Sequence, residues 1–307
     1  MKLQKEFKQN ILEYYLTLHW KQWHLLGFQT NIKKTDFTID LEALIISTFF
    51  AGHFDKRLIY SMIEWIEINR EWISLSRIKN ILKFYTREVK NESVSYPSKL
   101  IIEILSQKKS DIKNLKFKDN EYSEIFKDYK KRGVVQKISF DNEQLIQLFL
   151  RTIFGVNSRV EIFLFLMSGK SENANYISKE IFYDQKIVFR VLKNWELSGL
   201  VKMENNGKEK LYSLNKSFGL VRNKIHKSPF LNWPGIFLSF GKIISILKNN
   251  DLSDDIYLVS SQLRNIYQDI LKLSNIAGVD LKHELNFQGE DLFFYLQDKL
   301  IKIFKSF

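Results

Sequence analysis

Apolar residues recur at helical spacing through the first third of the chain. Between residues 3 and 26 they return every three or four positions with charges between them, and Gly27 can end this helix. Three more helices are predicted to begin at Asp40, Asp55 and Ser74, because these side chains can accept hydrogen bonds from the free N–H groups of a first helical turn. Residues 1–95 are therefore predicted to form an N-terminal helical module.

The chain then becomes more polar and rich in lysine before helical periodicity returns. Residues 96–141 are predicted to be a basic connecting region, with one helix after Pro97 and another near residues 121–131. A C-terminal helical region is expected over residues 217–307, with Pro234 in a first helical turn and helices over residues 236–247, 251–276 and 289–307.

The segment between these regions, residues 142–216, is predicted to form a helix, a second helix, a turn, a third helix and a hairpin, in that order. Asn157 can cap a helix that Gly169 ends, and a short helix follows over residues 176–181. Asp184 can cap a third helix, in which Val188, Leu192 and Trp195 fall on one face at spacings of four and three. That face is predicted to turn toward the core.

The other face of the third helix and the hairpin carry the candidate binding residues. Asn206-Gly207 is a dipeptide that two-residue hairpin turns prefer, so residues 200–204 are predicted to pair with residues 208–214. Amines on such a hairpin can follow a phosphate backbone. The candidate nucleic-acid contacts are Gln185, Lys186, Phe189, Arg190 and Lys193 on the helix, and Lys202, Lys208 and Lys210 on the hairpin.

These residues resemble winged helix-turn-helix DNA-binding domains of bacterial and archaeal regulators. The resemblance implies that residues 184–198 are a recognition helix for the major groove and that the hairpin is the wing. Two positions depart from it: Phe182 lies where such domains often have glycine, and Phe189 lies where an outward residue is usually small and polar. The residues that carry the resemblance are Ile177, Ser178, Ile181, Asp184, Gln185, Lys186, Val188, Arg190, Leu192, Lys193, Trp195, Gly199, Leu200, Val201, Gly207, Lys208, Tyr212 and Leu214.

A looser similarity extends beyond this segment. Residues 150–162, together with residues 54–58 and Glu64-Trp65, resemble a poorly characterised bacterial family of winged-helix proteins that are often encoded beside nucleotidyltransferases. This resemblance implies regulation and transfers no catalytic residue.

Composition narrows the function further. The 307 residues suggest about two domains, and the fold is expected to be mainly α. Lysine plus arginine is 47 against 35 for aspartate plus glutamate, so the net charge of +12 favours an anionic partner such as double-stranded DNA. The absence of cysteine excludes disulfides and thiolate metal sites. The first residues lack a secretory signal and no apolar stretch is long enough to span a membrane, so a cytoplasmic protein without membrane contact is expected.

The sequence contains no complete pattern typical of a catalytic or cofactor-binding site. Gly169-Lys170-Ser171 lacks the glycine five positions earlier that a phosphate-binding loop needs. His19 and His24 are five residues apart, a spacing that does not place them on one helical face, so ring packing is the better interpretation. The sequence thus predicts a protein that is not an enzyme and has no cofactor and no metal.

Two functions stay open. The first is a DNA-binding transcriptional regulator. The alternative is a winged-helix module that binds protein, such as an antitoxin-like partner of a neighbouring enzyme, and the outward ring of Phe189 favours it. The terminal helices also have enough apolar surface for a homodimer. Packing within the core of one chain is the favoured use of their aromatic residues, which are Trp20, Trp23, Phe237, Phe293, Phe294 and Phe304.

Overall fold

The computed structural model describes residues 2–29, 35–89, 98–106, 129–133, 135–215, 229–249, 255–282, 287 and 289–307. Within these ranges the protein is mainly helical, as predicted, with one antiparallel sheet of two strands. The helix expected near residues 121–131 lies almost wholly outside the described residues.

The N-terminal helices begin where their capping residues predict. Asp40 accepts a hydrogen bond from the amide of Ala43 at 3.2 Å, and Asp55 and Ser74 cap the next two helices in the same way. The side-chain caps satisfy N–H groups that a helix leaves unpaired in its first turn. The helices are α1 (Lys2–Leu25), α2 (Leu41–Ala51), α3 (Lys56–Asn69), α4 (Leu75–Glu88) and α5 (Ser98–Ser106).

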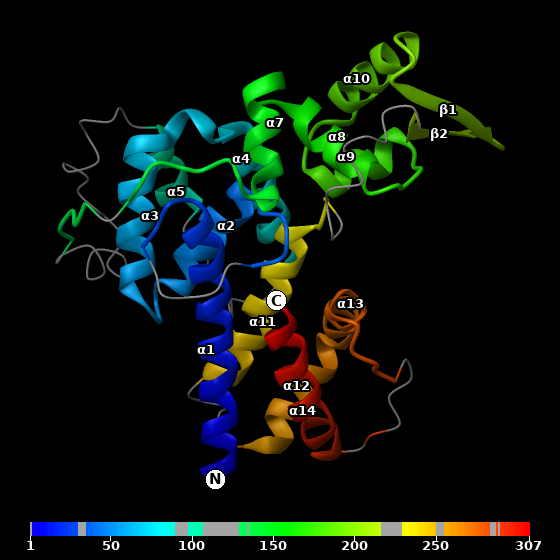
Figure 1. The fold of residues 1–307 in the computed structure, drawn as a ribbon. Helices are drawn as coiled ribbons and strands as arrows, with labels where there is room; N and C mark the ends of the chain where they lie inside the picture. The colour runs from blue at the N-terminus through cyan, green and yellow to red at the C-terminus, as the bar shows by residue number, and fades with distance from the viewer. Residues whose placement is uncertain are drawn as a thin grey trace.

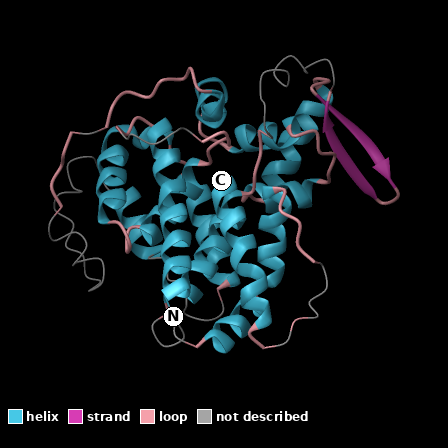
Figure 2. Cartoon of the chain, turned by 60° about the horizontal axis from the view of Figure 1, so that its bottom comes forward, coloured by secondary structure: helices cyan, strands magenta, loops and turns pink. Residues whose placement is uncertain are grey.

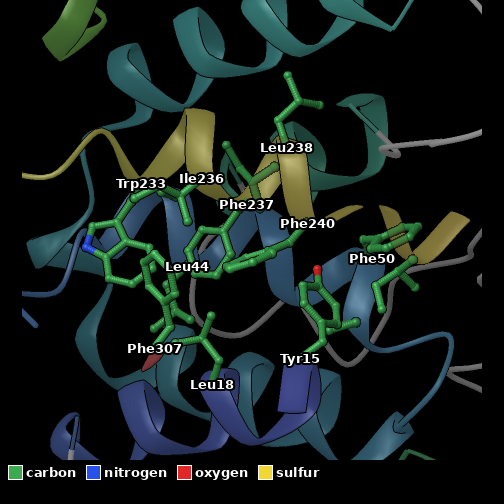
Figure 3. Close-up of a cluster of buried hydrophobic side chains, with 14 of the residues drawn as sticks. Tyr15, Leu18, Leu44, Phe50, Trp233, Ile236, Phe237, Leu238, Phe240 and Phe307 are labelled. Carbon is green, nitrogen blue, oxygen red and sulfur yellow. The ribbon is translucent and has the colours of Figure 1, made fainter. Parts of the chain in front are cut away.

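The C-terminal helices complete the same core instead of forming one of their own. Helix α14 lies along α1, and α11 lies against α2 and α1 (Figure 1). The aromatic rings of Phe237 and Phe240 pack beside Tyr15 and Leu44 in this core (Figure 3). We call α1–α5 and α11–α14 the helical body. Its C-terminal members are α11 (Trp233–Lys248), α12 (Ile256–Asn265), α13 (Tyr267–Ala277) and α14 (Asp291–Ser306).

Most of the aromatic residues of the terminal helices are buried in this core, as favoured above. Trp23, Phe237, Phe293 and Phe304 are at most 3% exposed, whereas Phe294 is 55% exposed. The buried four are therefore already used within one chain.

The prediction of a single helix over residues 251–276 is wrong, because α12 and α13 are separate helices that meet at Ile266. Apolar spacing continues across the break, so periodicity carries no sign of it. Contacts from distant residues hold the second helix: Lys242 binds Asp269 at 2.7 Å, and the hydroxyl of Tyr267 donates to the carbonyl of Lys282.

Residues 146–214 form a second cluster of elements with its own core, which we call the central unit. Its helices are joined to the helical body at one side, while its hairpin points away (Figure 1). Asn157 caps its second helix, and Gly155 ends its first with a φ of 75°. The elements are α7 (Ile146–Phe154), α8 (Ser158–Met167), α9 (Ala174–Ile181), α10 (Gln185–Leu197), β1 (Val201–Asn206) and β2 (Glu209–Leu214).

Candidate nucleic-acid interface

Helix α10 presents the face that its sequence predicts. The carboxylate of Asp184 accepts from the amides of Lys186 and Ile187 at 2.9 and 3.3 Å, so the helix starts at a capped end. Val188 and Leu192 are fully buried against the core of the central unit, and Trp195 is partly buried there. The opposite face is left to solvent.

All five candidate residues of α10 lie together on that solvent face. They line an open hollow of about 570 Å³ with Asn194, and each is exposed. Of the six residues that line the hollow, three are cationic, and Gln185 and Asn194 can each both donate and accept hydrogen bonds. Asn194 was not among the predicted residues, although its position four after Arg190 places it on the same face. The lining residues are Gln185, Lys186, Phe189, Arg190, Lys193 and Asn194.

The hairpin forms with its loop one residue later than predicted, which shifts the strand pairing by two residues. Asn206 pairs with Glu209, so the two loop residues are Gly207 and Lys208, not Asn206 and Gly207. Gly207 has a φ of 60°, which suits glycine. A third segment pairs with the other edge of β2, because Tyr212 exchanges backbone hydrogen bonds with Glu172.

The three hairpin lysines are all exposed but do not share a face. Lys202 is opposite Ser213 in the ladder, whereas Lys210 is opposite Asn205, which belongs to the alternate set of side chains. Lys208 lies in the loop at the tip of the projecting hairpin (Figure 2). Exposed Glu204 and Glu209 also lie on the hairpin, and Glu209 directly follows the loop, so three lysines and two glutamates leave residues 201–214 with a net charge of only +1.

The turn before α10 contains Phe182, one of the two residues that depart from the resemblance described above. Phe182 has φ 61° and ψ 46°, a left-handed conformation, and no other non-glycine residue of the described chain has a positive φ. This backbone conformation favours glycine, although the residue here is phenylalanine. Phe189, the other departure, is 44% exposed, which confirms that its ring faces outward.

A buried cluster of charges joins the central unit to the helical body. Arg151 on α7 donates to Glu42 on α2 at 2.8 Å and to Glu161 on α8 at 2.7 Å, while Arg77 on α4 donates to Asp40 and Glu42. Burial raises the pKa of Glu42, but the charges of Arg151 and Arg77 outweigh burial and hold that pKa at about 2. Burial raises the pKa of Glu161, and Arg151 offsets only part of this effect. We call these five residues the buried charge cluster.

His19 and Lys170, the residues considered above for metal or phosphate binding, make contacts within the protein. His19 is fully buried, with Nε2 2.7 Å from the hydroxyl of Ser47 and Nδ1 2.9 Å from the carbonyl of Tyr15, which agrees with the packing interpretation. Lys170 places its amine 5.3 Å from the ring centre of Phe165. In the part of the chain that the structure describes, no cluster of histidine and acidic residues could hold a metal ion, and no helix is long and apolar enough to cross a membrane.

Comparison with known proteins leaves this chain without a match. No family model, no curated protein and no solved structure is similar to it. The function is therefore argued from the geometry of α10 and its surroundings.

Proposed function

We propose that this protein is a DNA-binding transcriptional regulator in which α10 enters the major groove and the hairpin lies on the phosphate backbone. The order α8, α9, α10, β1 and β2 supports a winged helix-turn-helix domain. An α-helix fits the major groove of double-stranded DNA, and in such domains the helix that follows the turn is the one that reads bases.

The solvent face of α10 carries the proposal. Arginine binds guanine and glutamine binds adenine through paired hydrogen bonds, and lysine neutralises phosphate. Arg190 and Gln185 supply the first two groups, and Lys186 and Lys193 supply the third, all around one hollow. The net charge of +12 supports the same class of partner.

Titration of the purified protein with DNA over a series of salt concentrations tests this function. The probes are the DNA upstream of its own coding sequence and a scrambled duplex of equal length. We expect tighter binding to the first duplex and an affinity for both that falls steeply as salt rises, because lysine and arginine release counterions from phosphate. Binding to neither duplex at low salt contradicts the proposal.

Single substitutions on α10 locate the contact. Arg190→Ala is expected to cost ~1–3 kcal/mol of binding free energy and to relax preference at one base pair, whereas Lys186→Ala should weaken all sequences alike if it contacts phosphate. Lys272→Ala on α13 is the matched control, because that side chain is 75% exposed and lies on the helical body. Equal affinities for all three variants, with unchanged circular dichroism, would remove α10 from the contact.

A protein-interaction module is the second candidate, and exposed apolar groups on α10 favour it. Phe189 and Ile187 are each 44% exposed. Aromatic residues such as Phe189 are enriched where proteins bind one another. The partner would be a protein such as the neighbouring enzyme of an antitoxin. Affinity for a partner held by these groups would change little with salt, which separates the two functions in one titration.

A further inference from the structure

The turn between α9 and α10 adopts a backbone that its residue does not favour. A side chain with a β-carbon is strained in the left-handed region, and glycine takes the same φ without strain. Phe182 nevertheless occupies this position with φ 61°. Its side chain must therefore make contacts that offset the strain.

Those contacts lie in the helical body and not in the core of the central unit. Phe182 is 7% exposed and belongs to the apolar cluster of the helical body. Its ring centre is 5.1 Å from that of Phe84 on α4. A residue of the central unit is thus inserted into the neighbouring core.

Polar groups of α4 bind the same turn at three successive residues. The carbonyl of Ile181 accepts from Nε of Arg77, and the carbonyl of Phe182 accepts from Nδ2 of Asn80, both at 3.0 Å. The hydroxyl of Tyr183 is 3.0 Å from that of Ser74, the cap of α4. Arg77 is itself paired with Asp40 and Glu42 in the buried charge cluster, so the turn is tied to a buried, ion-paired side chain.

We propose that α4 clamps this turn, and that Phe182 and Asn80 are positioning residues that fix the direction of α10 relative to the helical body. The proposal rests on the proposed function, because it concerns the presentation of α10 to DNA. A helix held in one direction is always ready to bind. If the clamp is released, only a fraction of molecules has α10 in that direction, and the apparent affinity falls by the same fraction.

Distances between two labels measure the clamp without DNA. The chain has no cysteine, so Leu197→Cys on α10 and Lys272→Cys on α13 place spin labels at two exposed positions only. Phe182→Gly and Asn80→Ala are made in this background, with Asn265→Ala, an exposed asparagine of α12, as the matched control. Phe182→Gly removes the ring and relieves the backbone strain, but glycine also frees the backbone of the turn. Asn80→Ala leaves the residues of the turn unchanged, so a loss of order in that variant comes from the lost contact with α4.

The clamp predicts one narrow distance distribution in the parent and in Asn265→Ala, and broad distributions in Phe182→Gly and Asn80→Ala. Amide exchange in residues 182–188 should speed up about tenfold, and DNA affinity should fall about tenfold with the base preference kept. Distributions as narrow as the parent's in both variants overturn the proposal. If Phe182→Gly does not fold, Asn80→Ala decides alone. If the parent binds no DNA, the proposed function fails while the distances and exchange rates still test the clamp.

Discussion

At the scale of single residues, local pattern predicts which side chains of α10 face solvent. Asp184 caps the helix and Val188 faces the core, because both follow from spacing within a few residues. The destination of Phe182 could not be predicted, because its partner Phe84 is 98 residues earlier in the chain and only the tertiary fold brings them together. The sequence marked Phe182 as unusual without indicating why.

Phe189 distinguishes the two candidate functions. Its ring is 44% exposed, so Phe189→Ser should leave the fold intact. If α10 reads DNA, the variant keeps its association state and changes its affinity or base preference, because the ring can contact a thymine methyl group in the groove. If the face binds protein, the variant loses an assembly and its salt-dependent DNA binding is unaffected or absent. Light scattering after size exclusion and DNA titration of the same preparation provide the two measurements.

His19 predicts a dependence of stability on pH. Nδ1 must carry the proton of the neutral ring, since the carbonyl of Tyr15 can only accept, and Nε2 then accepts from Ser47. Burial lowers the pKa of His19 to about 4, below its ordinary 6.5. The unfolded chain therefore binds the proton more tightly, and the stabilisation is complete above pH 6.5 and lost as pH falls to about 4.

The loss amounts to about 3 kcal/mol of the free energy of unfolding, at 1.36 kcal/mol for each pKa unit. Urea unfolding of the wild type and of His19→Gln at the two ends of this range measures it. His19→Gln is expected to be less stable near neutral pH but to lose less stability on acidification. Parallel losses in both proteins would show that another group causes the dependence.

At the scale of elements, pattern predicts where helices and strands lie better than how they pair. The hairpin forms at the position that the alternation of apolar and polar residues and the Asn206-Gly207 dipeptide predict. Its loop, however, consists of Gly207 and Lys208. Both registers keep Val201 and Tyr212 on the same side, so alternation cannot choose between them. Glu172 binds the outer edge of β2 from 40 residues earlier in the chain, a contact that alternation within the hairpin does not indicate.

The shift places Lys208 in the loop and Lys210 near the tip, which makes the hairpin testable as a backbone contact. Replacing both with glutamate should reduce affinity for specific and scrambled DNA by similar factors. If each lysine neutralises one phosphate, the slope of log affinity against log salt becomes shallower by about two units. Lys272→Glu controls for the change of net charge, with half the charge difference and a position on the helical body. An unchanged slope in the double variant would mean that the hairpin does not contact DNA.

At the scale of the whole molecule, the regions predicted from composition do not correspond to separate cores. The first and last thirds of the chain share one core, which a pattern within either third cannot indicate. The central unit has its own core but is joined to the helical body by Phe182 and by the buried charge cluster. Of the cluster, the sequence predicted a structural role only for Asp40, as a helix cap.

The buried charge cluster holds three carboxylates and two arginines. Because of this imbalance, removing an arginine is expected to cost much more stability than neutralising a carboxylate. Arg151→Met leaves Glu42 and Glu161 with no guanidinium between them, so we expect a loss of ~3–5 kcal/mol in the free energy of unfolding. Glu161→Gln keeps an oxygen in place of Oε1, which accepts from Gln147 and Arg151. It should therefore cost no more than about 1 kcal/mol.

The pH dependence of the second variant completes the test. Because the pKa of Glu161 is raised from its ordinary 4.5, the folded protein holds this proton more tightly than the unfolded chain does. The contribution of Glu161 is thus most favourable below pH 4.5 and declines as pH rises through its raised pKa, whereas glutamine does not titrate. Glu161→Gln should gain stability relative to the wild type as pH increases, and urea unfolding across this range measures the difference. A difference that shrinks with rising pH would show instead that Glu161 is stabilised as a carboxylate, and would contradict the raised pKa of Glu161.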